Sequence, residues 1–511
     1  MLPPLLAAVT AAACGAPPPP PPPPPDAPLE TNVAAADYVG PQVCGECHPD
    51  EHARWSGSLH AVMNQRAGDA AVIGDFATSL AYRGGVARFE RDGDGAHTMT
   101  LSRPGRVTLR YRVTRTIGAR GLQEYVGFEE SPTSLQPGGE VRLPFAWWPR
   151  GRGWYPQPYF DPWLAEDDFD AYAPVREPWA ERCPWCHSTY PFEQRIGRAS
   201  AREVGHGLEQ HFRGAPGAER LDVAQQVTVG ISCESCHLGG RAHAAGGPIH
   251  MVPIAGAIGA VALPGAPVPS TFAAERRDPA IVNAACAQCH SGPSPRFPDG
   301  SATRNSSEAL DLARSACTTA RCVDCHDPHR TDARADAARA VAACARCHPA
   351  TPRDHAGAGH AGVSCLDCHM PRIVMGIDGH VRSHRISSPR DARMLAAGAP
   401  NACNLCHLDR TTRWTAAELG VELRRARVDV DEPAGELWLA SPEPAVRMVA
   451  ASAHARARLP LEPLLRGLDD PLAHVRAWAR FAVEDALGRR IDFDPRAAPD
   501  VRRAQISRLR R

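Results

Sequence analysis

The hydrophobic and polar positions of the chain change their spacing twice, and each spacing predicts a different kind of structure. Near residue 90 apolar and polar residues alternate, and Asp92-Gly93-Asp94-Gly95 separates the runs 86–92 and 96–102. Alternation with a period of two predicts strands, and an Asp-Gly turn between two such runs predicts a hairpin. Two further alternating runs follow at 107–114 and 122–128. We therefore predict a small antiparallel β meander in this part of the chain.

The C-terminal part has helical spacing instead. Its residues are rich in Ala, Leu and Arg, and the pattern Pro-x-x-x-Val-Arg-x-x-Ala begins at Pro442 and again at Pro471. A pattern that returns in this way resembles HEAT-like helical repeats, although a plain α-helical tail packed on the rest of the protein would also fit. We predict an α-helical HEAT-like repeat region over 411–511.

The middle of the chain has no sustained periodicity. Five Trp residues lie among many prolines in 141–179. A segment of this kind more often covers a buried group or caps a core than forms a binding site. Between 180 and 410 the apolar runs are short, so side chains alone would build a poor core there.

Composition and charge exclude several classes of protein. The 511 residues contain 57 basic and 57 acidic side chains, which gives no electrostatic reason to expect nucleic acid as a partner. After the first dozen residues no apolar stretch approaches the roughly 20 residues that a transmembrane helix needs, which excludes an integral membrane protein. Every basic residue is Arg, and the absence of Lys excludes Schiff-base chemistry and a Walker-type phosphate site.

The cysteines carry the chemistry. Sixteen of the 18 lie in the pattern Cys-x-x-Cys-His, which occurs eight times. Two thiols three residues apart on one helical turn can both bond to the vinyl groups of a haem, and the next residue, His, then lies beneath the iron. A disulfide, a redox pair or half a zinc site can also use Cys-x-x-Cys, but none of these requires a His after every second Cys. We therefore predict eight covalently bound c-type haems.

Each motif supplies two thioether cysteines and one proximal iron ligand. The predicted thioether residues are Cys44, Cys47, Cys183, Cys186, Cys233, Cys236, Cys286, Cys289, Cys322, Cys325, Cys344, Cys347, Cys365, Cys368, Cys403 and Cys406. The predicted proximal ligands are His48, His187, His237, His290, His326, His348, His369 and His407. The remaining Cys317 has no assigned role, and we interpret it as a buried thiol.

The spacing of the motifs predicts the architecture. Seven motifs fall between Cys183 and His407, so haems would replace much of the ordinary core. We expect a mainly α fold with extensive irregular structure wrapped around haems, a small antiparallel β insert and C-terminal helical repeats. The expected divisions are a signal peptide at 1–14, a Pro-rich tether at 15–37, a first haem segment at 38–80, a β-rich and Trp/Pro-rich insert at 81–179, a multihaem domain at 180–410 and the repeats at 411–511.

The N-terminal residues indicate export. Residues 1–14 form a short apolar segment that ends in small residues before Cys14, and nine prolines follow at 17–25. This resembles a bacterial lipoprotein signal with Cys14 as the lipidated residue, although Cys14 could also be discarded with the signal peptide. Covalent haem attachment takes place outside the bacterial cytoplasm. We therefore expect the protein on the periplasmic side of the envelope, with a possible lipid anchor to the outer membrane.

Fourteen histidines lie outside the motifs and are candidates for the second axial position of each iron. His97 falls in the β insert, and His454 and His474 fall in the C-terminal helices. We expect these three on the surface, which leaves eleven, enough for eight irons.

Several ordered pieces of sequence resemble the cytochrome c-552/c-554 family of multihaem cytochromes c between residues 38 and 410. The pieces are Tyr38-Val-Gly-Pro-Gln-Val-Cys-Gly-Glu-Cys-His48, Trp55-Ser-Gly-Ser-Leu-His60, Val229-Gly-Ile-Ser-Cys-Glu-Ser-Cys-His237 with Ala242-His243, Cys322-Val-Asp-Cys-His-Asp-Pro-His329, His360-Ala-Gly-Val-Ser-Cys-Leu-Asp-Cys-His-Met-Pro371, and Ser383-His384-Arg-Ile before Asn401-Ala-Cys-Asn-Leu-Cys-His407. The resemblance implies His60, His243, His329, His360 and His384 as distal ligands, with His206, His211, His250 and His355 as further candidates.

The resemblance leaves two functions open. An electron-transfer cytochrome would pass electrons between redox partner proteins in the periplasm or membrane. An oxidoreductase would instead act on a small nitrogen or sulfur oxyanion at one haem that lacks a distal ligand. Pentahaem nitrite reductases place a Lys on the catalytic haem, and this chain has no Lys. Hydroxylamine oxidoreductases cross-link a Tyr downstream of the haem motifs, whereas all Tyr residues of this chain lie at or before Tyr190. The first function is preferred, and no catalytic residue is identified.

Overall fold

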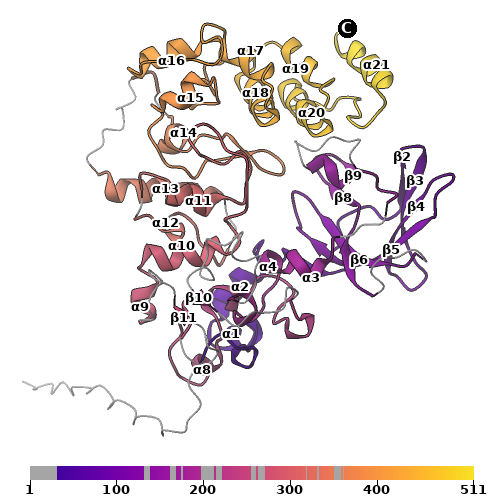
Figure 1. The fold of residues 1–511 in the computed structure, drawn as a ribbon, viewed down its shortest axis with the longest axis vertical. Coiled ribbons are helices and arrows are strands. Elements are labelled where there is room, and N and C mark those ends of the chain that lie inside the picture. The colour runs from indigo at the N-terminus through magenta and orange to yellow at the C-terminus, as the bar shows by residue number, and fades with distance from the viewer. Residues whose placement is uncertain are drawn as a thin grey trace, which may run out of the picture.

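A computed structural model gives the fold. It describes residues 31–131, 138–160, 169–173, 177–196, 212–213, 221–254, 261–262, 271–317, 319–330, 333–349, 358–360 and 362–511. Figure 1 shows three regions: a column of short helices that carries most of the motifs, a β-rich region beside it, and a layer of C-terminal helices that reaches from the end of the column toward the β-rich region. Within the described residues no helix is long and apolar enough to cross a membrane.

The β-rich region is an antiparallel sheet of seven strands in the order β2-β3-β4-β5-β6-β7, with β1 paired to β5. The strands are β1 Asn64–Arg66, β2 Thr78–Tyr82, β3 Gly85–Arg91, β4 His97–Ser102, β5 Leu109–Ile117, β6 Glu124–Glu129 and β7 Glu140–Arg142. The predicted hairpin is confirmed, because β3 pairs with β4 across the Asp-Gly turn. The sheet is larger than the predicted meander, and its first strands come before residue 81.

A second hairpin lies in the Trp-rich segment, where the sequence pattern predicted no regular structure. Strand β8 (Phe145–Trp148) pairs with β9 (Gly153–Pro156), which sets Trp147 opposite Trp154. The ring of Trp154 stacks on Phe89 of the sheet with ring centroids 3.9 Å apart and an interplanar angle of 2°. These aromatic side chains form the core beneath the sheet.

His97 is buried under the sheet, so its expected surface position is wrong. Only 6% of the residue is exposed, and its ring lies edge-on to Phe76 at 4.8 Å between centroids. Burial lowers its pKa, with a smaller contribution from Arg91. The strand places this position on the face that meets the aromatic core, which residue type alone did not indicate.

The C-terminal helices form a regular layer. They are α17 Ala434–Leu439, α18 Pro444–Ala457, α19 Glu462–Gly467, α20 Ala473–Leu487 and α21 Pro499–Leu509. The repeated sequence pattern has a repeated structural role. The Nη1 of Arg447 donates to the carbonyls of residues 441 and 442 at 2.8 and 3.0 Å, and the Nη1 of Arg476 donates to those of 470 and 471 at the same distances. Each Arg thus fixes the loop that enters its helix.

His454 and His474 are also buried, so the expectation that they lie on the surface is wrong. Each is 4% exposed. His474 stacks on Trp148 at 5.9 Å between centroids, and the Nδ1 of His454 lies 3.1 Å from the carbonyl oxygen of Ala450. Helix α20 is covered on every side between residues 473 and 483, so its polar positions are buried together with its apolar ones.

The column consists of short helices joined by turns. Its helices, with those of the N-terminal segments, are α1 Pro41–Cys47, α2 Pro49–Ser56, α3 Trp179–Arg182, α4 Pro184–His187, α5 Glu193–Ile196, α7 Glu234–His237, α8 Arg241–Ala244, α9 Phe272–Glu275, α10 Pro279–Ala287, α11 Glu308–Ala313, α12 Cys322–Cys325, α13 Ala333–Cys347, α14 Cys365–His369, α15 Ala392–Ala396 and α16 Thr412–Glu418. Two small ribbons accompany them, β10 Phe212–Arg213 with β11 Val261–Ala262 and β12 Val374–Met375 with β13 His380–Val381. Most helices here are one or two turns long.

The three regions meet at one hydrophobic cluster. Trp148 of the β-rich region, Met375 of the column and Trp478 of α20 all belong to it. Arg150 and Arg152 lie beside Trp148 and pair with Asp485 and Glu484 at 2.8 and 2.6 Å. The cluster joins all three regions, and the ion pairs join the β-rich region to α20.

Candidate functional site

Each motif occupies a single helical turn. In six motifs the backbone N–H of the His donates to the carbonyl of the first Cys at 2.9 to 3.1 Å, which closes that turn. These bonds are His48 to Cys44, His237 to Cys233, His290 to Cys286, His326 to Cys322, His348 to Cys344 and His407 to Cys403. None of the 17 cysteines that the structure describes forms a disulfide. Two thiols and an imidazole therefore leave one short turn together, as covalent haem attachment requires.

Three motif histidines face a second histidine at the distance that one shared metal would set. Metal–nitrogen bonds of about 2.0 Å and about 1.1 Å from each nitrogen to its ring centre put two imidazoles on one metal about 6.2 Å apart between centroids. The observed separations are 6.1, 6.1 and 6.3 Å, with interplanar angles of 16°, 24° and 85°. The pairs are His48 with His243, His326 with His384, and His407 with His360. The residues present thus fit a haem with two axial histidines at each of these sites.

Two further pairs are close enough to interact electrostatically. Burial lowers the pKa of His60, and the neighbouring motif residue His290 lowers it further. Burial also lowers the pKa of the motif residue His237 to about 4, with His329 as the next cause. Of the five histidines named from the resemblance, three thus form ring pairs with a motif histidine and two lie within electrostatic range of one.

Hydrogen bonds orient several of these rings through Nδ1. The acceptors are the carbonyl of Gly247 for His243 at 3.0 Å, that of Arg382 for His384 at 3.1 Å and that of Ser387 for His369 at 2.8 Å. An Nδ1–H bound in this way fixes the tautomer and leaves Nε2 for a metal. His250 has the same arrangement, since its Nδ1 lies 2.8 Å from the buried carboxylate of Glu275.

Two motif histidines have carboxylate partners instead. The Nδ1 of His290 lies 3.3 Å from Glu308, and the Nδ1 of His326 lies 3.0 Å from Asp336. The bond with Glu308 raises the pKa of His290 to about 9. Burial opposes ionisation of Glu308, but the bond from His290 outweighs it and lowers the pKa of Glu308 to about 2. Neither carboxylate could be identified from the sequence as a partner of a motif histidine, because both lie ten or more residues from their motif.

Some candidates have no such pairing. His206, His211, His355 and Cys14 lie outside the described residues. In the part of the chain that the structure describes, neither His187 nor His348 has a second histidine ring against it. The nearest aromatic ring to His187 is that of Trp179, at 6.3 Å between centroids. His250 lies beside Glu275 rather than in a ring pair.

Neighbouring motifs lie near one another through their cysteines, and their order in space differs from their order in sequence. Cys44 is hydrogen-bonded with Cys233, and Cys286 with Cys322. Four further pairs lie within electrostatic range: Cys236 with Cys286, Cys325 with Cys344, Cys344 with Cys365, and Cys368 with Cys403. The second motif joins this row from the side, because the thiols of Cys186 and Cys289 reach the carbonyls of Gln288 and Trp185 at 4.0 and 3.9 Å. The first and the third to eighth motifs form one row, with the second beside the fourth.

A buried carboxylate connects the first and third motifs. Glu234, inside the third motif and 2% exposed, accepts backbone N–H groups of Val39, Gly40 and Gly240 at 2.8 to 2.9 Å. Three such bonds compensate for the burial of its charge. This one side chain therefore holds the segment before the first motif against the third.

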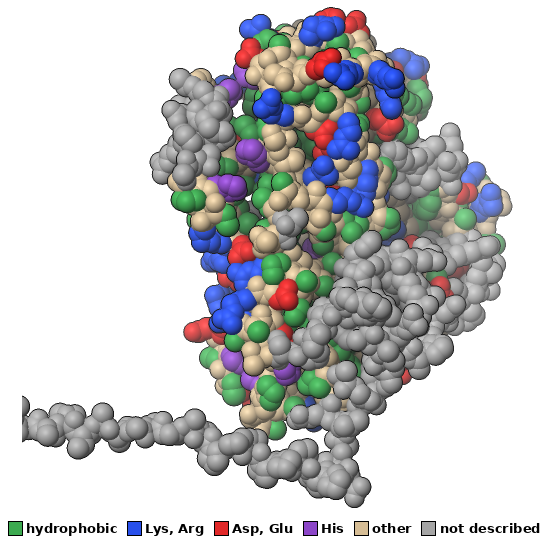
Figure 2. All heavy atoms as spheres, turned by 60° about the vertical axis from the view of Figure 1, so that its left-hand side comes forward, with side chains coloured by type: hydrophobic (Ala, Val, Ile, Leu, Met, Phe, Trp, Pro, Cys, Tyr) green, Lys and Arg blue, Asp and Glu red, His purple; other side chains and the backbone are tan. Residues whose placement is uncertain are grey.

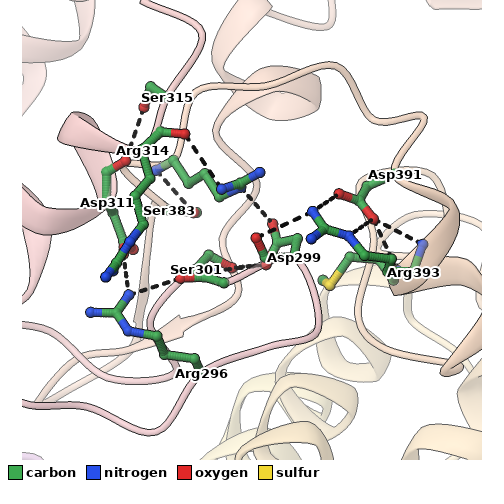
Figure 3. Close-up of polar contacts among 12 residues, drawn as sticks. Arg296, Asp299, Ser301, Asp311, Arg314, Ser315, Ser383, Asp391 and Arg393 are labelled. Carbon is green, nitrogen blue, oxygen red and sulfur yellow. Dashed lines mark hydrogen bonds and ion pairs between the residues drawn. The ribbon is translucent and has the colours of Figure 1, made fainter. Parts of the chain in front are cut away.

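A polar network fixes the main chain at His384 (Figure 3). The buried Asp311 accepts from Arg296 at 2.9 Å and from the backbone of Ala302. Ser315 donates to the carbonyls of Asp311 and His384 at 3.0 and 2.9 Å. The network connects helix α11, which also carries Glu308, to the segment of His384. On the face of the molecule that Figure 2 shows, arginine side chains are spread along the surface, and histidines lie in its upper half and near its lower end.

Comparisons with known proteins agree with these motifs. Residues 354–419, which include the seventh and eighth motifs, match the family model of cytochrome c552. Among solved structures the chain is similar to the outer cell wall cytochrome OcwA, with 16% identity, a TM-score of 0.42, and coverage of 92% of this chain and 98% of that one. No curated protein matches the chain. The matched segment contains His360 and His407, which face one another.

Proposed function

We propose that the chain is a multihaem c-type cytochrome that transfers electrons along a row of eight haem sites. The observation that carries this proposal is the row of motifs, in which the cysteines of each motif are hydrogen-bonded to those of the next or lie within electrostatic range of them. Sites that follow one another closely in series suit a path for electrons. The haem iron supplies reversible one-electron chemistry, and its ligands and surroundings set the potential.

The chain's own residues supply attachment, ligation and position. Each Cys pair would hold one haem edge, and each motif His would occupy one axial position. At three sites a histidine from a different segment faces the motif His, as His243 faces His48. A site with a histidine on both sides has no position for a substrate, which favours electron transfer over catalysis at those three sites.

The proposal includes location and partners. Covalent haem attachment places the mature protein outside the bacterial cytoplasm, in the periplasm or at the outer membrane, where Cys14 would carry a lipid anchor. The partners would be redox proteins of that compartment or membrane. The near balance of acidic and basic residues suits docking to proteins better than binding to nucleic acid.

The first experiment is to express the full chain with haem maturation and to measure its mass and spectra. We expect a mass increase of eight haems, a low-spin ferric electron paramagnetic resonance spectrum, and no change when carbon monoxide is added to the reduced protein. A high-spin signal that binds carbon monoxide would overturn a purely electron-transferring function. Assays with nitrite, hydroxylamine and tetrathionate would then test reduction of a small nitrogen or sulfur oxyanion.

Matched variants test the attachment and ligand assignments. Cys325→Ala should lose one thioether bond, which haem-stained gels under denaturing conditions and mass spectrometry detect, whereas Cys317→Ala should keep all the haem. His384→Ala should create one high-spin, carbon monoxide-binding haem. A low-spin spectrum in the His384→Ala protein would contradict its assignment as the ligand opposite His326.

A further inference from the structure

The motif histidines differ in what their Nδ1 atoms meet. Those of His290 and His326 meet carboxylates, at 3.3 and 3.0 Å. That of His369 meets a backbone carbonyl at 2.8 Å. The Nδ1 atoms of His187 and His237 are buried and have no hydrogen-bond partner among the described residues. One chain thus presents charged, neutral and missing acceptors to chemically identical ligands.

We infer that Glu308 and Asp336 set the haem sites of His290 and His326 at lower reduction potentials than those of His187 and His237. This inference rests on the proposed haem attachment. A carboxylate that accepts the Nδ1–H increases the electron density of the imidazole, and a more electron-rich axial ligand stabilises the ferric over the ferrous iron. The partly buried carboxylates add negative charge close to the iron, which acts in the same direction.

Both carboxylates are held in place by the fold. An oxygen of Glu308 accepts the backbone N–H of Ser306 at 2.9 Å, which directs the other oxygen to His290. Asp336 lies on α13, the helix that leads into the sixth motif, and its side chain is 17% exposed. The carboxylate side chains are only 25% and 17% exposed, so each contact should persist when the ring is bound to iron.

The two sites are neighbours in the middle of the row. Cys286 of the fourth motif hydrogen-bonds Cys322 of the fifth, and the second motif joins the row beside the fourth. Adjacent low-potential sites at this point separate the first three motifs from the last three. Electrons would then reside on the haems of the first three motifs or on those of the last three. Electron transfer between these two groups would require thermal activation through the two central haems.

The test is a spectroscopic redox titration of the holoprotein and two variants. In Glu308→Gln the amide oxygen can still accept the Nδ1–H, but the negative charge is gone. We expect one haem to titrate at a higher potential. Its oxidised-to-reduced equilibrium should change about tenfold, which corresponds to about 59 mV for a one-electron couple. Asp336→Asn should do the same for a second haem, and the double variant should move both.

The control is Asp94→Asn, the same acid-to-amide change at a side chain that pairs with Arg112 on the sheet at 2.9 Å. It should leave the titration unchanged. Electron paramagnetic resonance should show altered g values for one haem in each carboxylate variant and for none in the control. Titrations of Glu308→Gln and Asp336→Asn that both superimpose on the wild type would overturn the inference, and a shift in either variant alone would restrict it to that site.

This outcome is separable from the proposed function. If carbon monoxide reveals an open iron, the protein is not a pure electron carrier, but the two carboxylates can still lower their haems' potentials. If every haem is low-spin and the titrations do not move, electron transfer stands and the carboxylate effect fails.

Discussion

Helices α13 and α20 have the same length and similar Ala- and Arg-rich sequences, yet they are covered differently. Each has 15 residues. Residues 473 to 483 of α20 are all buried, whereas of the α13 side chains that the structure describes only Ala340 is. Helix α20 packs against other helices and Trp148, while α13 leads to the thiols of the sixth motif. The C-terminal layer is thus stabilised by packing of polypeptide on polypeptide, whereas α13 has little such cover and would be stabilised by the proposed haems.

The histidines differ between the two regions in the same way. His454 and His474 are buried among helices, while His290 and His326 leave half of their side chains exposed. A packed histidine contributes to a core, but an exposed histidine beside two thiols is free to bind a group.

The largest effect should come from withholding haem. Without haem, and under reducing conditions, we expect backbone amides of α13 to exchange with solvent rapidly while those of α18 and α20 stay protected, because α13 is barely covered by other polypeptide whereas α18 and α20 are buried. Hydrogen exchange followed by mass spectrometry measures both regions in one sample. Protection of α13 in the haem-free chain equal to that in the holoprotein would remove the distinction.

A core truncation in the C-terminal layer should be the next largest. Trp478 is 2% exposed and belongs to the cluster where the three regions meet. Trp478→Ala should destabilise the helices by about 3–5 kcal/mol in denaturant titrations followed by circular dichroism, because it leaves a large cavity. Leu487→Ala, at the exposed end of the same helix, should cost only about 0.5 kcal/mol. The haem absorption of folded Trp478→Ala should stay unchanged, and a lost axial ligand would contradict this.

Acid should weaken the cluster between the regions. Burial, then Arg456 and Arg150, lowers the pKa of His380 to about 3, and burial, then Arg304, lowers that of His474 to about 3. The unfolded chain binds these protons more readily, so the stabilisation is complete above about pH 6.5 and is lost as the pH falls toward 3. The loss is about 2 kcal/mol per histidine at about pH 5.

Denaturant titrations of the helical layer across this range measure the effect. The double variant His380→Gln/His474→Gln should show a flatter dependence on pH, since it has no ring to protonate at these positions. Equal slopes for the variant and the wild type would assign the acid sensitivity to other groups.

The smallest effect concerns the ion pair between Arg413 and Asp431, at the seam between the column and the C-terminal layer. The two side chains lie 2.6 Å apart but are 59% and 63% exposed. Solvent screens such a pair, so Asp431→Asn should leave the unfolding midpoint unchanged within error. The backbone bond from Arg413 to Val430 at 3.0 Å holds this seam instead. A clear shift of the midpoint would show that charge couples the two regions.

Local patterns in the sequence predicted local structure well. The Asp-Gly turn predicted the β3–β4 hairpin, and the repeated Pro-x-x-x-Val-Arg pattern predicted a repeat whose Arg residues have equal roles. The β8–β9 hairpin was missed because its aromatic residues are buried on a core that only the folded sheet provides. The burial of His97 and His474 was missed for the same reason.

The candidate site could be predicted only as far as its motifs. The turns of Cys-x-x-Cys-His are local, so the sequence identifies the attachment residues directly. The partners of these turns come from other segments: His60 lies 230 residues before His290, and Glu308 lies 18 residues after it. The resemblance to a family indicated five distal histidines, but it did not indicate their pairing, the row of motifs or the two carboxylates.

The contacts between cysteines of different motifs also constrain how the protein is made. Cys44 lies against Cys233, and Cys286 against Cys322, in the folded chain. Thiols at such contacts can oxidise to disulfides in an oxidising compartment, and these would join the wrong motifs. A chain that folded before loading would thus be trapped by its own native contacts. Under the proposed haem attachment, maturation would have to cap these thiols while the chain is still open, so that attachment precedes folding.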